Sequence, residues 1–149
     1  MIGIERIRKM RKKTNWFWNV IIVFTLIGCT LAFVLHYKNW TSIKEGYLMI
    51  TSGIYRQQIP LNTINTLEFV PKLPEMQRKN GFSWLAKEKG LFLDSISGKE
   101  VYVFVDDLRQ RKLHIVHNDS LELYVNLADS LETQNLFDQL NMEGTSSYE

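Results

Sequence analysis

Residues 15–37 of the chain read NWFWNVIIVFTLIGCTLAFVLHY, a stretch without a single Asp, Glu, Lys or Arg. Within residues 16–35, the most polar residue is Asn19. At a rise of about 1.5 Å per residue, these 20 residues make a helix of ~30 Å, the thickness of a hydrocarbon core. We therefore predict a transmembrane helix over residues 15–37. Amphipathic rings flank it, as they do at membrane interfaces: Trp16, Trp18, His36, Tyr37 and Trp40.

The residues before this run form a basic tip, 1–14. Residues 1–13 hold six basic side chains against one acid, Glu5, although the whole chain carries a net charge of only +2. Because basic residues beside a first membrane helix are retained in the cytoplasm, we expect a cytoplasmic tip and an extracytoplasmic carboxy-terminal domain. The remainder of the chain is mildly acidic, so this charge indicates a membrane-side tip and no nucleic-acid surface.

A cleaved signal is the alternative to a retained span. The segment Leu26-Ile27-Gly28-Cys29 resembles the lipobox of bacterial lipoproteins, in which the cysteine receives a diacylglycerol and the preceding signal is removed. The six residues after Cys29 are Thr-Leu-Ala-Phe-Val-Leu, where lipoproteins usually turn polar. The retained span is therefore preferred, and lipidation of Cys29 stays open. Because Cys29 is the only cysteine, no disulfide can form within one chain.

The remainder of the chain is expected to comprise a linker over 38–46, a domain over 47–141 and a flexible tail over 142–149. In the domain, short β-type runs alternate with turn residues, which favours an antiparallel barrel or sandwich. Residues 101–105 are apolar on both faces, so this run should lie centrally. Seven strands are predicted: Tyr47–Thr51, Ile54–Ile59, Ile64–Val70, Leu91–Asp94, Val101–Asp106, Lys112–His117 and Leu121–Leu127.

A helix is expected at the end of the domain. Asp129 followed by Glu132 is typical of a helix N-terminus. One apolar stripe follows, which would close the open end of the barrel: Thr133, Leu136, Phe137 and Leu140.

In order along residues 40–140, several short motifs resemble those of the bacterial PH-like domains. They are Tyr47-Leu-Met-Ile-Thr-Ser-Gly-Ile-Tyr, Ile59-Pro60-Leu61 with Ile64, Arg78-Lys-Asn-Gly81 before Lys89-Gly-Leu-Phe92, Tyr124-Val-Asn126 and Asp129-Ser-Leu-Glu-Thr133. The resemblance implies seven strands in two orthogonal sheets capped by one helix. It also implies a bacterial protein attached to a membrane helix, with no assigned chemistry. The chain departs from the family's glycine-rich pattern at Phe82-Ser-Trp-Leu-Ala86.

The segment Pro71–Gly90 is the candidate interaction loop, because long connections in compact domains are often functional. Its cations and apolar side chains would suit a partner groove or a headgroup layer. The preferred interpretation is plainer: the apolar residues pack on the barrel and the charges form a solvated rim. The candidate residues are Arg78, Lys79, Phe82, Trp84, Leu85, Lys87 and Lys89.

Other chemistries have little support in the sequence. The turn Thr51-Ser-Gly53 is short and uncharged, so it is not expected to bind inositol phosphates. His114 and His117 are three apart on a predicted strand and point to opposite faces, so they cannot share a metal ion. We find no catalytic motif and expect neither an enzyme nor a cofactor.

The sequence therefore predicts a single-pass protein of the bacterial plasma (inner) membrane. Its role is expected to be binding or structural, most simply through a protein partner near the bilayer, with no nucleic-acid partner. The alternative is a lipid-headgroup or small-ligand sensor that uses the 71–90 loop.

Overall fold

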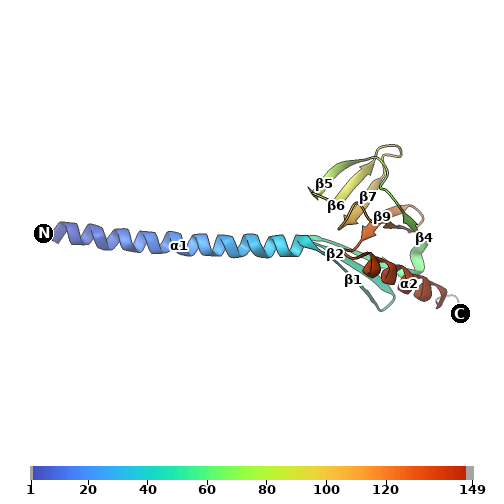
Figure 1. Ribbon diagram of the computed structural model, residues 1–149, viewed down its shortest axis with the longest axis horizontal. Helices are drawn as coiled ribbons and strands as arrows, with labels where there is room; N and C mark the ends of the chain where they lie inside the picture. The colour runs from blue at the N-terminus through green and yellow to red at the C-terminus, as the bar shows by residue number, and fades with distance from the viewer. Residues whose placement is uncertain (1, 147–149) are drawn as a thin grey trace. The chain divides into compact units, whose positions relative to one another are not determined.

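The computed structural model describes the backbone of residues 2–146, and the side chains of residues 15–35 and 37–144. The chain divides into two compact units, one ending at Leu35 and the other beginning at His36. We call the second one the β unit. The single long helix α1, Ile2–Tyr37, is drawn in blue in Figure 1.

The apolar part of α1 is Asn15–Leu35, long enough to cross a bilayer by length and composition. An apolar helix at this position is confirmed, and such a helix serves either as a membrane anchor or as a signal sequence. The hydroxyl group of Thr30 is satisfied within the helix, because its Oγ1 donates to the carbonyl oxygen of Leu26 at 2.8 Å. This is how hydroxyl side chains are accommodated where no water is available.

The β unit contains nine strands, a short 3₁₀ turn and a second helix. The first sheet has the order β1-β2-β3, and the second has the order β4-β8-β9-β7-β6-β5. All neighbouring strands are antiparallel except β7 and β9, which are parallel. The elements are β1 Asn39–Lys44, β2 Tyr47–Ser52, β3 Tyr55–Pro60, η1 Leu61–Thr63, β4 Ile64–Val70, β5 Met76–Trp84, β6 Lys87–Asp94, β7 Glu100–Val105, β8 Lys112–His117, β9 Leu121–Asn126 and α2 Ser130–Ser146.

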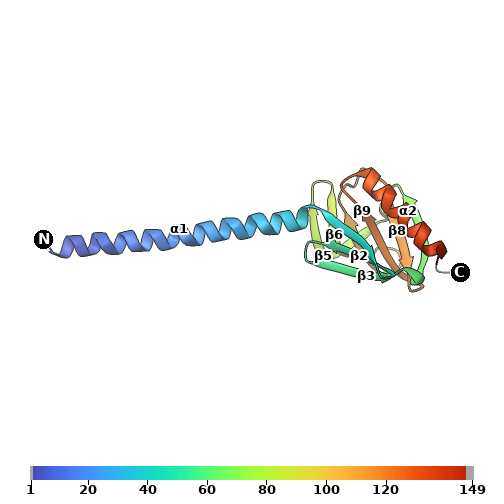
Figure 2. The same cartoon turned by 90° about the horizontal axis from the view of Figure 1, so that it is seen from below.

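The expected mainly-β domain with a terminal helix is confirmed, whereas the barrel form of the prediction and its count of seven strands are wrong: the fold is α+β, with nine strands in two sheets and a terminal helix (Figure 2). Two strands were not predicted. The expected linker 38–46 forms β1, whose first residue, Asn39, is polar yet buried. The expected loop contains β5, which is mostly polar and exposed, and whose register shifts between Arg78 and Asn80. Neither segment has the regular apolar alternation by which strands are recognised.

The main core lies between the three-stranded sheet, one face of the six-stranded sheet and α2. Its members come from both sheets and from the helix, so each layer buries its apolar side only in the presence of the others. They are Leu48, Ile50, Ile59, Leu61, Phe104, Leu113, Ile115, Leu123, Val125, Leu136 and Leu140.

A second, smaller core covers the opposite face of the six-stranded sheet. It consists of Phe92, Val101, Val103, Val105 and Tyr124. Strand β7 contributes to both cores and lies between β6 and β9. Its predicted central position is therefore confirmed.

Helix α2 begins as predicted. The backbone N–H of Leu131 donates to Asp129 Oδ1 at 2.9 Å, which caps the helix N-terminus. Thr133, Leu136 and Leu140 are buried, so the predicted stripe is confirmed. The helix continues to Ser146, so it extends into the segment expected to be a flexible tail; residues 147–149 lie outside the described part of the chain.

Candidate interaction site

The segment expected to be a loop is a β-hairpin, formed by β5 and β6 with a turn at Leu85 and Ala86. Gly81 and Gly90 face each other across it, and a side chain on either would collide with the opposite backbone. The hairpin separates the seven candidate residues into exposed and buried groups. Arg78 is exposed, and exposed Lys79 pairs with Glu100.

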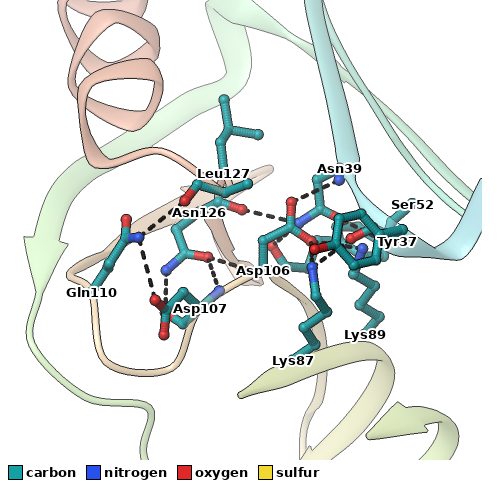
Figure 3. A network of polar contacts seen from close by, with 12 residues as sticks. Tyr37, Asn39, Ser52, Lys87, Lys89, Asp106, Asp107, Gln110, Asn126 and Leu127 are labelled. Carbon is teal, nitrogen blue, oxygen red and sulfur yellow. Dashed lines mark hydrogen bonds and ion pairs between the residues drawn. The ribbon is translucent and has the colours of Figure 1, made fainter. Parts of the chain in front are cut away.

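Two of the candidate lysines point inward, toward the carboxylate of Asp106, the residue that follows β7. Lys89 is fully buried, and its Nζ lies 2.7 Å from Asp106 Oδ1. Lys87 Nζ lies 3.7 Å from the same oxygen and donates to the carbonyl oxygen of Tyr37 at 2.5 Å (Figure 3). Tyr37 is the last residue of α1, so an ammonium group caps a helix C-terminus here. The interpretation of these two lysines as a solvated rim is wrong.

The second oxygen of Asp106 holds the start of β1. The backbone N–H of Asn39 donates to Asp106 Oδ2 at 2.8 Å. The Asn39 amide donates to the carbonyl oxygens of Phe104 at 2.6 Å and Asn126 at 2.9 Å. Its own oxygen accepts from Ser52 Oγ at 2.6 Å. Asn39 therefore links the two sheets directly after the apolar helix.

Asn126 completes this buried polar network on the other side. Its Oδ1 accepts from the backbone N–H of Asp106 at 2.7 Å, and its Nδ2 donates to the carbonyl oxygen of Asp107 at 2.7 Å. Asn126 is therefore a hydrogen-bonding residue at the end of β9. We define the junction network as Asn39, Lys87, Lys89, Asp106 and Asn126.

Burial dominates the electrostatics of the interior lysines. Burial lowers the pKa of Lys89 from its ordinary value, and the hydrogen bond to Asp106 opposes that change. Burial also lowers the pKa of Lys112, whose ammonium donates to the carbonyl oxygens of Pro71, at 3.0 Å, and Leu108. Both groups are held by fixed protein acceptors, so they have structural roles and are not available to bind headgroups.

The tip of the hairpin, in contrast to these buried lysines, carries exposed apolar side chains. Leu85 is 90% exposed and Trp84 is half-exposed. Phe82 is partly buried and makes an edge-to-face contact with Trp84, with 6.2 Å between ring centroids. The expected packing of Trp84 and Leu85 on the barrel is wrong, because Trp84 at the end of β5 is half-exposed and Leu85 lies in the exposed turn that follows.

A groove follows strand β1 where it faces α2. Two hollows of about 280 and 400 Å³ lie between these elements. Strand β1 is the end strand of its sheet, so in the described part of the chain one edge of it has no partner strand. We define the β1–α2 groove by Lys38, Trp40, Thr41, Ile43, Glu132, Asn135, Gln139 and Met142, which line the two hollows.

A further cavity of about 410 Å³ opens beside the connection between β4 and β5. Apolar side chains of Leu73, Met76, Phe92 and Leu108 line it, together with charged residues that include buried Lys112. This mixed lining is typical of small-ligand sites.

The two histidines lie on opposite faces of β8, as predicted. His114 stacks on Tyr124 at 4.4 Å between centroids and bridges two carboxylates, Glu68 at 3.1 Å and Glu122 at 3.2 Å. His117 is buried, and burial lowers its pKa. Among the side chains that the structure describes, no three His, Cys, Asp or Glu residues are grouped to hold a metal ion.

Tyr124 provides a test of this face of the sheet. Burial, followed by the nearby charge of Glu122, raises the pKa of Tyr124 to about 12. A raised acid pKa favours the neutral form in the fold, so its stabilisation is complete below pH ~10 and is lost as the pH rises through about 12. The loss should reach about 3 kcal/mol, and Tyr124→Phe should abolish it. Alkaline absorbance titration of both proteins, with unfolding measured at each pH, gives the comparison; a Tyr124 that ionises near pH 10 would contradict the burial.

No family model, curated protein or solved structure was found to match this chain.

Proposed function

We propose that the chain is a single-pass membrane protein whose β unit binds an extended segment of a protein partner close to the bilayer, without catalysing a reaction. The observation that carries this proposal is the β1–α2 groove, which combines a free strand edge with a helix wall. Attachment to a bacterial plasma (inner) membrane, with the amino terminus in the cytoplasm, belongs to the same proposal. So does membership of the PH-like domains, supported by a mainly-β unit that ends in a helix.

An extended peptide is the occupant that the groove's chemistry favours. A strand edge offers a row of backbone donors and acceptors, which an added strand satisfies without any particular side-chain sequence. The helix side adds amide groups from Asn135 and Gln139, both exposed. Trp40, also exposed, supplies the aromatic surface that is enriched in protein interfaces.

Photocrosslinking in intact cells tests the groove. A photoreactive residue at Gln139 faces the groove, while one at the adjacent Asp138, which is also exposed, does not line it. We expect Gln139 and Thr41 to capture the same partner protein, at positions a few residues apart in one segment, and Asp138 to capture none of it. Equal capture from Asp138, or adducts scattered over unrelated proteins, would refute the groove as a binding site.

A small-ligand sensor is the second candidate, favoured by the cavity at Leu73 and Met76. Three of the seven candidate interaction residues argue against headgroup binding, because their charges are already paired within the fold. Lys87 and Lys89 contact Asp106, and Lys79 pairs with Glu100. If the cavity holds a ligand, native mass spectrometry of the full chain should detect a bound small molecule that Met76→Trp removes. The same mass for both proteins, apart from the substitution, would rule the sensor out.

A further inference from the structure

Three turns of the described β unit carry a large apolar side chain that is at least 80% exposed, and two of them, at Leu85 and Ile54, lie at the end of the unit where β1 begins. Leu85 is 90% exposed at the β5–β6 turn, and Ile54 is 80% exposed at the β2–β3 turn. Neither turn contains an acidic residue: their sequences are Ser52-Gly-Ile54 and Ser83-Trp-Leu-Ala86. Exposed apolar side chains mark a contact surface where several of them are gathered at one place.

The β5–β6 turn lies beside the residue at which α1 ends. Lys87 Nζ is 2.5 Å from the carbonyl oxygen of Tyr37 and lies over the Tyr37 ring, 4.1 Å from its centroid. Leu85 precedes Lys87 by two residues, each adding about 3.3 Å of strand. The apolar tip is therefore a close neighbour of Tyr37 within the β unit.

The β2–β3 turn lies at the same end of the domain. Ser52 is paired with Asn39 on one side and with Tyr55 on the other, and Ile54 lies in the turn between Ser52 and Tyr55. Asn39 follows Tyr37 by only two residues. Both turns are thus held next to the start of β1.

The short helical connection from Leu35 to Tyr37 limits the distance between Tyr37 and the hydrocarbon core of the membrane. The apolar segment ends at Leu35, and Tyr37 is two residues later in the same helix. Two residues of helix rise only ~3 Å, whereas the polar layer on each side of a bilayer is about 5–7 Å thick. If α1 spans a membrane, Tyr37 and the groups that contact it lie in the headgroup layer.

The identity of the residue at the hairpin tip points the same way. Leu85 has φ of +53°, a left-handed conformation in which glycine or asparagine is the usual choice. Leucine at this position is unfavourable for the backbone and leaves its side chain exposed in water. A residue that disfavours its own backbone conformation, and whose side chain adds no packing within the fold, is typical of a functional position.

We propose that the turns at Ile54 and at Trp84–Leu85 insert their apolar side chains into the headgroup layer of the bilayer that holds α1. The β unit then lies against the membrane by a contact additional to its covalent attachment, in the manner of interfacial apolar anchors. This inference rests on the proposed membrane anchoring of the chain. It concerns the lipid surface and leaves the β1–α2 groove to the protein partner.

Lipid-borne quenching of a site-specific fluorophore tests the proposal on the full chain in liposomes. Cys29→Ala removes the only native thiol, and single cysteines then replace Leu85, Ile54, Ile96 or Phe24 in turn. Ile96 is the matched control, since it is 91% exposed in the β6–β7 turn. Strand β6 separates it from the Leu85 tip by ~23 Å. Phe24 lies near the middle of the apolar segment, so its quenching by a nitroxide deep in the acyl chains reports whether α1 itself is inserted.

We expect probes at Leu85 and Ile54 to show blue-shifted emission that is lost with a nitroxide near the lipid headgroup, and the probe at Ile96 to be unaffected. Quenching at Phe24 without quenching at Leu85 and Ile54 would overturn the inference and leave the anchor intact. A blue shift at the turns without lipid quenching would also overturn it, because the probes would then be covered by protein. Absence of quenching at Phe24 would refute the anchor, and the inference with it.

Discussion

Asp106→Asn is expected to destabilise the β unit by about 3–5 kcal/mol, because it leaves the ammonium group of Lys89 buried without its counter-charge. Lys89 Nζ lies 2.7 Å from Asp106 Oδ1, and both side chains are almost completely buried. Asparagine keeps the shape of the side chain and an oxygen for the backbone N–H of Asn39, but its NH2 group then faces the Lys89 ammonium in place of the carboxylate oxygen. Pulse proteolysis in urea, on the full chain in detergent micelles, measures the change.

Two control variants separate this effect from a general loss of charge. Lys79→Met removes an exposed pair with Glu100 and should change stability by no more than about 1 kcal/mol. Adding Lys89→Met to Asp106→Asn removes the buried charge altogether and should restore a large part of the loss. If the stability changes of Asp106→Asn and Lys89→Met, each measured alone, add up to that of the double variant, Lys89 and Asp106 do not act as a pair.

Gly90→Ala is the second substitution expected to have a large effect, about 2–5 kcal/mol, because strain and collision add. Gly90 has φ of +135°, which side-chain-bearing residues rarely adopt. An added Cβ would lie 2.5 Å from the Cα of Gly81 and closer still to the carbonyl oxygen of Asn80. The β5–β6 strands would have to separate, and the turn at Leu85 would move with them.

Gly144→Ala provides the matched control for the glycine substitution. Gly144 lies in α2, and nothing is within 4 Å of the position that its Cβ would occupy. Alanine there should be neutral or should stabilise by up to about 1 kcal/mol, since it reduces the freedom of the unfolded chain. If Gly90→Ala were as well tolerated as Gly144→Ala, the hairpin geometry described above would be incorrect.

Elements with a clear apolar pattern, either a continuous run or a regular stripe, could be predicted from the sequence. Val101–Val105 is apolar at every position and lies centrally, and the stripe on α2 is buried as its spacing indicated. Strand β1 could not be predicted, because its buried first residue is Asn39, whose burial depends on acceptors from β7 and β9. Strand β5 is polar and carries a register shift, so its pairing with β6 determines its structure, and local sequence does not.

The candidate residues show the same limit. Sequence alone gave Lys87 and Lys89 the same character as exposed Arg78, yet the hairpin turns both lysines toward Asp106. The partner of a buried charge is a long-range contact, and residues 89 and 106 carry no local signal of their pairing. Conversely, the exposure of Leu85 depends on a two-residue turn that contains neither Gly nor Asn, so the usual signature of a hairpin was absent.

The claim on which the proposed function depends is that α1 remains attached to the β unit and stays in the membrane. An intact mass measurement on the protein left in membranes after an alkaline carbonate wash tests this claim most directly. The account predicts a chain that includes the basic tip and carries no lipid on Cys29. A chain that begins at Cys29 and carries an added lipid, or a chain recovered only in the wash, would contradict it.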